Sequence, residues 1–136
     1  MTTAIAHPNI ALVKYWGKQN HILNYPASPS LSITLDSLIT KTKVSASTET
    51  RLLLNGKRNE DLKVAKFLDL FREKFELPPV CVETDNNFPT GAGLASSASG
   101  FAALVTALNE NFQLGLSLSS LSEWARRGSA SAARSI

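Results

Sequence analysis

The sequence predicts a single domain built from both strands and helices. Its 136 residues suit one domain better than two. With 43% apolar and 18% charged residues, the chain can build a packed core, which excludes disordered, collagen-like and low-complexity classes. No apolar run approaches the ~18 residues of a membrane span, so we expect no membrane partner. A single cysteine excludes an internal disulfide. The first lysines follow the apolar stretch at the N-terminus, which is the reverse of a secretory signal, so we expect a reduced, cytoplasmic setting.

Strand patterns dominate the first half of the chain. β-Branched and small apolar residues predict four strands, over Thr3–Val13 with an interruption at Pro8, Ser32–Leu38, Thr40–Thr48 and Val80–Glu83. In the third of these, Thr40, Thr42, Val44 and Ala46 share one face. Asn55-Gly56 after Arg51–Leu54 predicts a hairpin. Polar residues and prolines predict loops over 19–30 and 85–89.

Helix patterns follow. Residues 61–75 place five apolar side chains on one helical stripe, ended by Pro78-Pro79: Val64, Phe67, Leu68, Phe71 and Phe75. A core-facing role explains that stripe better than a ligand role. Residues 94–112 predict a helix rich in small residues. Ser120–Glu123 has the form of a capping box, which predicts a short helix through Arg127 that is closed by Gly128.

The charge distribution favours small anionic ligands. Fourteen basic residues against eleven acidic ones give a net charge of +3. Residues 1–48 hold four lysines against one aspartate, and the last three charges of the chain are arginines. Two basic islands in a balanced chain suit a small anion better than a polyanion, which needs a continuous stripe. We therefore expect no nucleic-acid partner.

The segment Pro89–Ala98 is the most informative. Its glycines allow close approach of the backbone, and a helix begins directly after them, so unpaired N–H groups could bind phosphate. Ser96 and Ser97 add hydroxyls that could reach phosphate oxygens or a magnesium shell. It is neither a Walker A loop nor a Rossmann fingerprint, since no Gly-Lys-Ser/Thr follows and Ser96 occupies the third glycine position. Alone, the motif fits a tight strand-to-helix turn equally well.

Two further segments have the same character. Lys14–Lys18 sets two lysines around two aromatic residues, which could hold a phosphate. Gly128–Arg134 combines a glycine, hydroxyls and an arginine whose planar fork suits a carboxylate. In isolation, the first fits a solvated surface with aromatic anchors and the second ordinary helix capping. Three such sites in so short a chain together predict binding of a phosphate-bearing ligand.

Four segments carry a family resemblance: Asn9–Lys18, Ser30–Leu35, Asn87–Ala98 and Ala125–Ser135. They resemble the diphosphomevalonate decarboxylases, within the superfamily of galactokinase, homoserine kinase, mevalonate kinase and phosphomevalonate kinase. The resemblance runs over essentially the whole chain, in order. The segment Pro89–Ala98 marks only the superfamily, whereas Lys14–Lys18 and Arg126–Arg134 are specific to the decarboxylases.

The resemblance implies an α+β fold like that of ribosomal protein S5 domain 2. It implies an enzyme that uses ATP and Mg²⁺ to phosphorylate the 3-hydroxyl of mevalonate 5-diphosphate, then releases phosphate and CO₂ to give isopentenyl diphosphate. It also implies a homodimer for the full enzyme. We expect residues 1–136 to form the N-terminal nucleotide- and substrate-binding domain, cut before its natural end, with the ferredoxin-like C-terminal domain absent and no turnover by these residues alone.

The resemblance also implies roles for individual residues. The ATP phosphates would be cradled by Pro89, Gly91, Ala92, Gly93, Leu94, Ala95, Ser96, Ser97 and Ala98. The substrate would be held by Tyr15, Trp16, Gly17, Lys18, Lys63, Ser129, Ala130, Ser131, Ala132, Ala133 and Arg134. Catalysis would depend on Lys14 near the reacting hydroxyl, on Arg134 pairing with the departing carboxylate, and on Asn9 orienting that arginine or the substrate.

The sequence departs from the family pattern at three points. Ala130 replaces a glycine, Pro29 interrupts a polar pair, and no residue replaces the catalytic aspartate, because Asp36, Asp61, Asp69 and Asp85 lie in other contexts. Two alternatives stay open. One is a related enzyme, such as a mevalonate 3-kinase or a monophosphate decarboxylase. The other is a non-catalytic phosphate-binding fragment.

Overall fold

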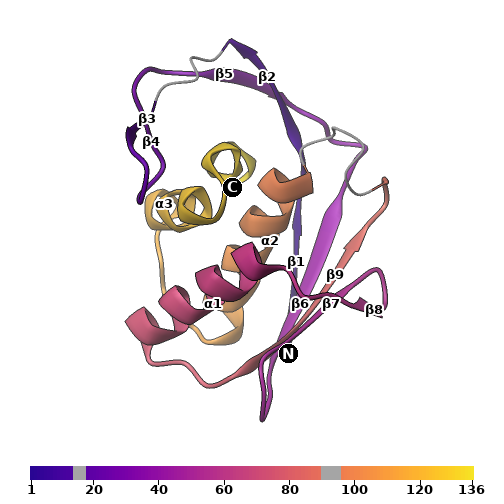
Figure 1. Ribbon diagram of the computed structural model, residues 1–136. Helices are drawn as coiled ribbons and strands as arrows, with labels where there is room; N and C mark the ends of the chain where they lie inside the picture. Colours follow the sequence, from indigo (N-terminus) through magenta and orange to yellow (C-terminus); the bar gives the residue numbers. More distant parts are fainter. Residues whose placement is uncertain (14–17, 90–95) are drawn as a thin grey trace.

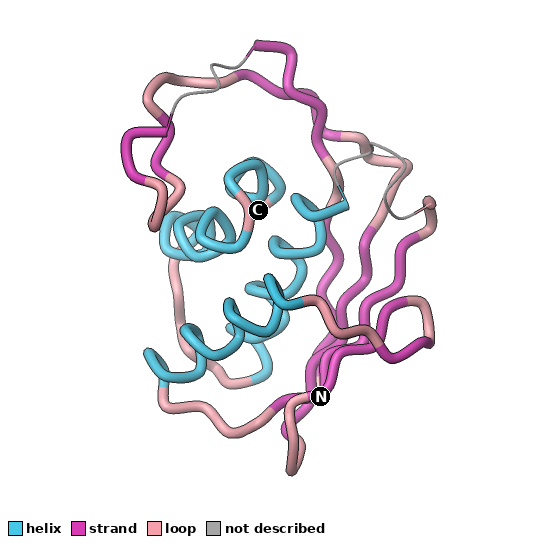
Figure 2. The backbone as a smooth tube through the Cα atoms, viewed as in Figure 1, coloured by secondary structure: helices cyan, strands magenta, loops and turns pink. Residues whose placement is uncertain are grey.

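Helices cover one face of a five-stranded sheet in the computed structural model, which describes residues 1–13, 18–89 and 96–136 (Figures 1 and 2). The sheet has the order β1 (Thr2–Ala6), β6 (Thr40–Ala46), β9 (Val80–Asn86), β7 (Arg51–Leu54) and β8 (Lys57–Arg58). The β7–β9 pair is parallel and the other neighbours are antiparallel. Strands and helices in this mixed arrangement confirm the α+β prediction.

The central strand β6 shows why the sheet has one apolar face. Thr40, Thr42 and Val44 are fully buried, while Lys41 between them is exposed, as the alternating pattern predicts. Two of the buried residues are polar and need partners. Thr40 donates to Asn86 and shares a hydrogen bond with Ser99 of the covering helix, and Thr42 bonds Thr84. This polar line ties the sheet to the helix above it.

The covering layer holds α1 (Leu62–Phe75), α2 (Ser96–Asn111), α3 (Leu118–Gly128) and the 3₁₀ helix η1 (Ala130–Ser135). Asp61 caps α1 by accepting hydrogen bonds from the backbone N–H groups of Lys63 and Val64. Glu76 ends that helix in a left-handed conformation, so α1 stops before the two prolines. The predicted capping box was wrong: α3 begins earlier, because the Ser117 hydroxyl accepts from the Ser120 backbone N–H.

The core lies between these helices and the sheet. Phe71 is 0% exposed and its ring lies 4.9 Å from that of Trp124 and 4.6 Å from that of Phe75, between centroids. The small residues of α2 let that helix lie close to β1 and β6, with Ala98, Ala102, Ala103 and Ala107 buried. Gly128 is the last residue of α3 and does not follow its end as predicted. A methyl group there would overlap the ring of Phe101.

Two ribbons extend from this body, near the top of Figure 1. One pairs β2 (Asn9–Val13) with β5 (Leu31–Thr34), and the other pairs β3 (Lys18–Asn20) with β4 (Tyr25–Pro26). The break predicted at Pro8 is confirmed, and it places β1 and β2 in different sheets. The loop predicted over 19–30 was wrong in part, since β3 and β4 pair across a turn, with Asn20 opposite Tyr25 and Lys18 opposite Pro26. Other boundaries differ as well: β5 ends before Leu38, β6 ends at Ala46 before Thr48, and β9 runs past Glu83 to Asn86, into the loop predicted over 85–89.

Candidate ligand site

Asn9 and Arg134 meet at the junction of β2 and η1. The Asn9 side chain is only 2% exposed. Its Nδ2 donates to the Ser131 carbonyl at 3.1 Å and to the Ser135 hydroxyl at 2.7 Å, while its Oδ1 accepts from Arg134 Nε at 3.2 Å. Because both ends of the amide are engaged, Asn9 holds the guanidinium in one orientation.

Ser30 fixes a second edge of the same guanidinium. Arg134 Nη1 donates to the Ser30 hydroxyl at 2.8 Å. The arginine therefore contacts both ends of the β2–β5 ribbon: Asn9 begins β2 opposite Thr34, whereas Ser30 directly precedes Leu31, which pairs with Val13 at the other end. The sequence analysis included Ser30 and Ser135 in segments that resemble the family but predicted no role for either residue in this network.

A row of serine hydroxyls connects the start of α2 with η1. Ser97 Oγ lies 3.4 Å from Ser129 Oγ, which lies 3.3 Å from Ser131 Oγ. Ser129 is buried and directly follows α3, whereas Ser97 is exposed in the first turn of α2. Two segments that the sequence analysis treated as separate anion sites therefore form one surface.

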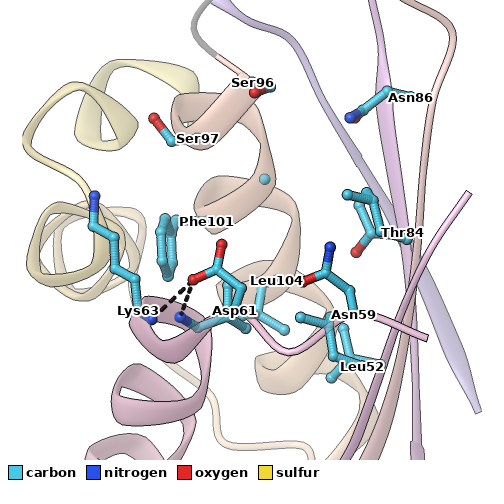
Figure 3. A pocket seen from close by; sticks show the side chains of 14 residues that line it. Leu52, Asn59, Asp61, Lys63, Thr84, Asn86, Ser96, Ser97, Phe101 and Leu104 are labelled. Atoms are coloured by element: carbon cyan, nitrogen blue, oxygen red, sulfur yellow. Dashed lines mark hydrogen bonds between the residues drawn. The ribbon is translucent and has the colours of Figure 1, made fainter. Parts of the chain in front are cut away.

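A cavity of about 160 Å³ opens beside the start of α2. Figure 3 shows Ser96, Ser97 and Phe101 of α2 on one side of it and Thr84 and Asn86 of β9 on the other. The lower part is apolar, with Leu52 and Leu104, and Asn59 and Asp61 stand at the start of α1. Such a cavity, apolar with a few polar groups, is typical of a site for a small organic ligand.

Lys63 lies at the edge of this cavity. Its Nζ is 5.6 Å from the centroid of the Phe101 ring, and the side chain is exposed. The structure thus brings Lys63 to Ser96 and Ser97 around one cavity. Phe101, Thr84 and Asn86 were missed by sequence reasoning, because these cavity-lining residues belong to a core helix and a core strand and no local motif distinguishes them.

The other predicted site residues fall into two groups. Ala98 and Ala132 are buried, Ala133 is half-buried, and Ala130 and Pro89 are exposed. Ala130 lies in η1 outside the left-handed backbone region, so its backbone conformation does not require glycine. The remaining predictions lie outside the described residues: Lys14, Tyr15, Trp16, Gly17, Gly91, Ala92, Gly93, Leu94 and Ala95. The backbone of Lys18 belongs to β3, but its side chain also lies outside the description.

Two features are absent from the described residues. Among them, no helix is long and apolar enough to cross a membrane. In the same ranges, no three His, Cys, Asp or Glu side chains gather where they could hold a metal ion.

The layered fold defines the class, an α+β domain with helices on one face of a mixed sheet and a cavity beside the start of α2. Residues 6–136 match the model of the diphosphomevalonate decarboxylase-like N-terminal domain, and the chain belongs to this family. Among curated relatives, the diphosphomevalonate decarboxylase mvd1 of Aspergillus fumigatus is 42% identical over 157 residues, which cover 98% of this chain and 39% of the relative. The Saccharomyces cerevisiae diphosphomevalonate decarboxylase is 40% identical, and the match covers 99% of this chain and 39% of that relative.

Solved structures agree with this assignment. The mevalonate diphosphate decarboxylase from Enterococcus faecalis is 47% identical, with a TM-score of 0.91 over 98% of this chain and 44% of that one. The Staphylococcus aureus mevalonate diphosphate decarboxylase is 43% identical, with a TM-score of 0.92, and the match covers 99% of this chain and 43% of that one. The chain thus spans roughly two fifths of the length of the curated relatives it matches, since 39% of the first of them is covered.

Proposed function

We propose that this chain supplies nucleotide- and substrate-binding residues of an ATP-dependent mevalonate 5-diphosphate decarboxylase. One observation carries the proposal: the row Ser97–Ser129–Ser131 connects the start of α2 with the Asn9–Arg134 network. A phosphate donor bound at α2 and an acceptor bound at η1 would then face each other across these hydroxyls. A solved structure described as MDDEF in complex with MVAPP, AMPPCP and magnesium, 47% identical to this chain, supports the same ligand set.

The nucleotide base fits the cavity under Phe101. Its apolar lower part, with Leu52 and Leu104, suits a flat aromatic ring. Ser96 and Ser97 at the start of α2 then lie beside the phosphates, together with Pro89–Ala98 as a whole. Lys63 at the rim adds a positive charge. Although the sequence analysis predicted Lys63 as a substrate contact, its place beside this cavity favours the nucleotide.

Magnesium would enter with the nucleotide. Mg²⁺ commonly keeps several waters and binds phosphate oxygens with only one or two protein ligands. The hydroxyls of Ser96 and Ser97 fit such a partial shell, and the described residues hold no competing acidic cluster. When bound, Mg²⁺ neutralises charge on the phosphates, while the protein's own residues orient them.

The substrate would lie along η1. Its diphosphate would accept hydrogen bonds from the Ser129 and Ser131 hydroxyls and from Tyr15 and Lys18, and its carboxylate would pair with Arg134. Phosphoryl transfer from ATP to the 3-hydroxyl breaks the bond to the γ-phosphate, gives ADP and a phosphate ester that is a good leaving group, and releases the hydroxyl proton to solvent. The C–O bond then breaks to release phosphate, and the C–C bond to the carboxylate breaks to release CO₂, leaving its electron pair in the new double bond. Lys14 would counter charge that develops near the hydroxyl.

Calorimetric titration tests this proposal with two ligands, AMPPCP with Mg²⁺ and mevalonate 5-diphosphate. Wild-type chain is expected to bind both. Arg134→Lys keeps the charge but loses the fork held by Asn9 and Ser30, so diphosphate affinity should fall about tenfold, with AMPPCP binding unchanged. Arg127→Lys is the matched control, because Arg127 is exposed and stacks on Trp124 of its own helix. Wild-type chain that binds no diphosphate, or an unaffected Arg134→Lys variant, would overturn the proposal.

The proposal extends to turnover, assembly and location. We expect no isopentenyl diphosphate from these 136 residues alone, and its detection in an assay with ATP would contradict that. Comparing mevalonate 5-diphosphate with mevalonate and its monophosphate separates the decarboxylase from a mevalonate 3-kinase or a monophosphate decarboxylase. For the full-length enzyme we propose a cytoplasmic homodimer, to be tested by sedimentation and by cell fractionation.

A further inference from the structure

The β3–β4 hairpin is attached to the body at the end of α3. Arg126 Nε donates to the Leu23 carbonyl at 3.2 Å, and its guanidinium carbon lies 4.1 Å from the centroid of the Tyr25 ring. In the opposite direction, Asn24 Nδ2 donates to the carbonyls of Arg126 at 3.0 Å and Arg127 at 3.3 Å. Three consecutive hairpin residues thus contact one helix end, about a hundred residues away in the chain.

These contacts make physical sense at this helix end. The last carbonyls of a helix have no partner within it, so a side-chain donor from elsewhere can satisfy them. Asn24 reaches them from a left-handed conformation, with φ of 54°, which asparagine tolerates better than most residues. The helix end and the hairpin turn therefore satisfy each other's polar groups.

Apolar burial does not hold this hairpin. Ile22 is 87% exposed and Tyr25 is 39% exposed. The ring of Tyr25 instead carries the Arg126 guanidinium, an arrangement that attracts a cation to the face of the ring. The hairpin position therefore depends on a small number of contacts around Arg126.

Both sides of this attachment lead to predicted substrate residues. On one side, β3 begins at Lys18, which pairs with Pro26 across the hairpin. On the other side, α3 ends at Gly128 and passes directly into Ser129 and η1. In Figure 1 the β3–β4 ribbon lies beside α3. The contacts of Arg126 with Leu23 and Tyr25 therefore join the hairpin that begins at Lys18 to the end of α3, which Ser129 directly follows.

We infer that Arg126, Tyr25 and Asn24 are positioning residues for the diphosphate end of the substrate. They touch no ligand themselves. They hold the strand that begins at Lys18 at a set distance from Ser129 and Ser131, so that both sides can bind the same diphosphate. This inference rests on the proposed function, which assigns those residues to the diphosphate.

Arg127 provides a matched control. Its guanidinium carbon lies 4.2 Å from the ring of Trp124, so it makes the same kind of stacking contact as Arg126. The ring belongs to its own helix, however, three residues earlier. Removing Arg127 removes a charge and a stacked arginine at the neighbouring position while leaving the side-chain contacts of Arg126 with the hairpin in place.

Titration with mevalonate 5-diphosphate and with AMPPCP–Mg²⁺ tests the inference. Arg126→Ala should weaken diphosphate binding about tenfold, because one hydrogen bond and one stacking contact are lost, and leave AMPPCP binding within about twofold. Arg127→Ala should change neither. Tyr25→Phe, which keeps the ring, should behave as wild type, while Tyr25→Ala should resemble Arg126→Ala. The double variant with both Arg126→Ala and Tyr25→Ala should bind the diphosphate no more weakly than Arg126→Ala alone, because that change already removes the stacking contact with Tyr25.

The possible outcomes separate the claims. Unchanged diphosphate affinity in Arg126→Ala overturns the inference. An equal loss of affinity for both ligands shows a general structural role of Arg126 and overturns it too. If wild-type chain binds AMPPCP but no diphosphate, the proposed function fails. The attachment is then judged by amide hydrogen exchange: faster exchange over residues 18–26 in Arg126→Ala, and not in Arg127→Ala, supports it, and unchanged exchange overturns it.

Discussion

The body of the molecule and its two ribbons are stabilised in different ways. In the body, large side chains such as Phe71, Leu108 and Val44 are fully buried between the helices and the five-stranded sheet. In the β2–β5 ribbon, Leu31 and Ile33 are more than half exposed. Polar contacts to the helices hold the ribbons, through Asn9 for one of them and Arg126 for the other.

This difference explains how the candidate site is divided. The cavity under Phe101 belongs to the body, where close packing keeps side chains in place. The proposed diphosphate side depends on the ribbons and on η1, where individual hydrogen bonds fix the geometry. We therefore expect changes in the body to affect folding, and changes at the ribbon contacts to affect ligand binding first.

The largest effect should come from a core aromatic residue. Phe71→Ala removes a ring at 0% exposure that contacts Phe75 and Trp124, and should lower the free energy of unfolding by about 3–5 kcal/mol. Ile33→Ala, at 52% exposure on the ribbon, should cost less than about 0.5 kcal/mol. Urea unfolding of both variants makes the comparison. Equal losses would show that the ribbon is packed as the body is.

An intermediate effect is expected where the body meets the serine row. Gly128→Ala places a methyl group in the ring of Phe101, which is itself packed against Phe67 at 5.2 Å between centroids, and should destabilise by about 1–3 kcal/mol. Gly100→Ala is the matched helical control, since no atom lies within 4 Å of its added methyl group, and it should stabilise by about 0.5–1 kcal/mol. Thermal unfolding measures both, and a stable Gly128→Ala variant would contradict this packing.

The smallest effect is expected at the start of α1. Asp61→Ala removes the acceptor for the backbone N–H groups of Lys63 and Val64 and should cost about 1 kcal/mol. Asp69→Ala on the same helix removes only an exposed ion pair with Arg72 at 3.9 Å and should cost about 0–0.5 kcal/mol. Chemical unfolding of the two variants distinguishes capping from surface charge, and a larger loss for Asp69→Ala would refute the capping argument.

Local sequence signals were a sound guide to most elements. The stripe Val64–Phe75 and the alternation along β6 produced the expected helix and strand, because each period reports one buried face. Asn55-Gly56 formed the expected turn, with both residues at positive φ. The start of α3 was mispredicted because several serines compete as caps there, and only the bond from Ser120 N–H to Ser117 distinguishes them.

Residue periodicity and turn chemistry over short distances predicted the mixed strand-and-helix content and most elements, and the order of residues in four segments carried the family resemblance. The tertiary structure alone decided that Asn9 would hold Arg134, that Ser97 would meet Ser129, and that Arg126 would carry Tyr25. These pairs are 125, 32 and 101 residues apart in the chain, the last from 126 − 25. Contacts at such separations follow from how helices and strands pack together, and no local pattern specifies them.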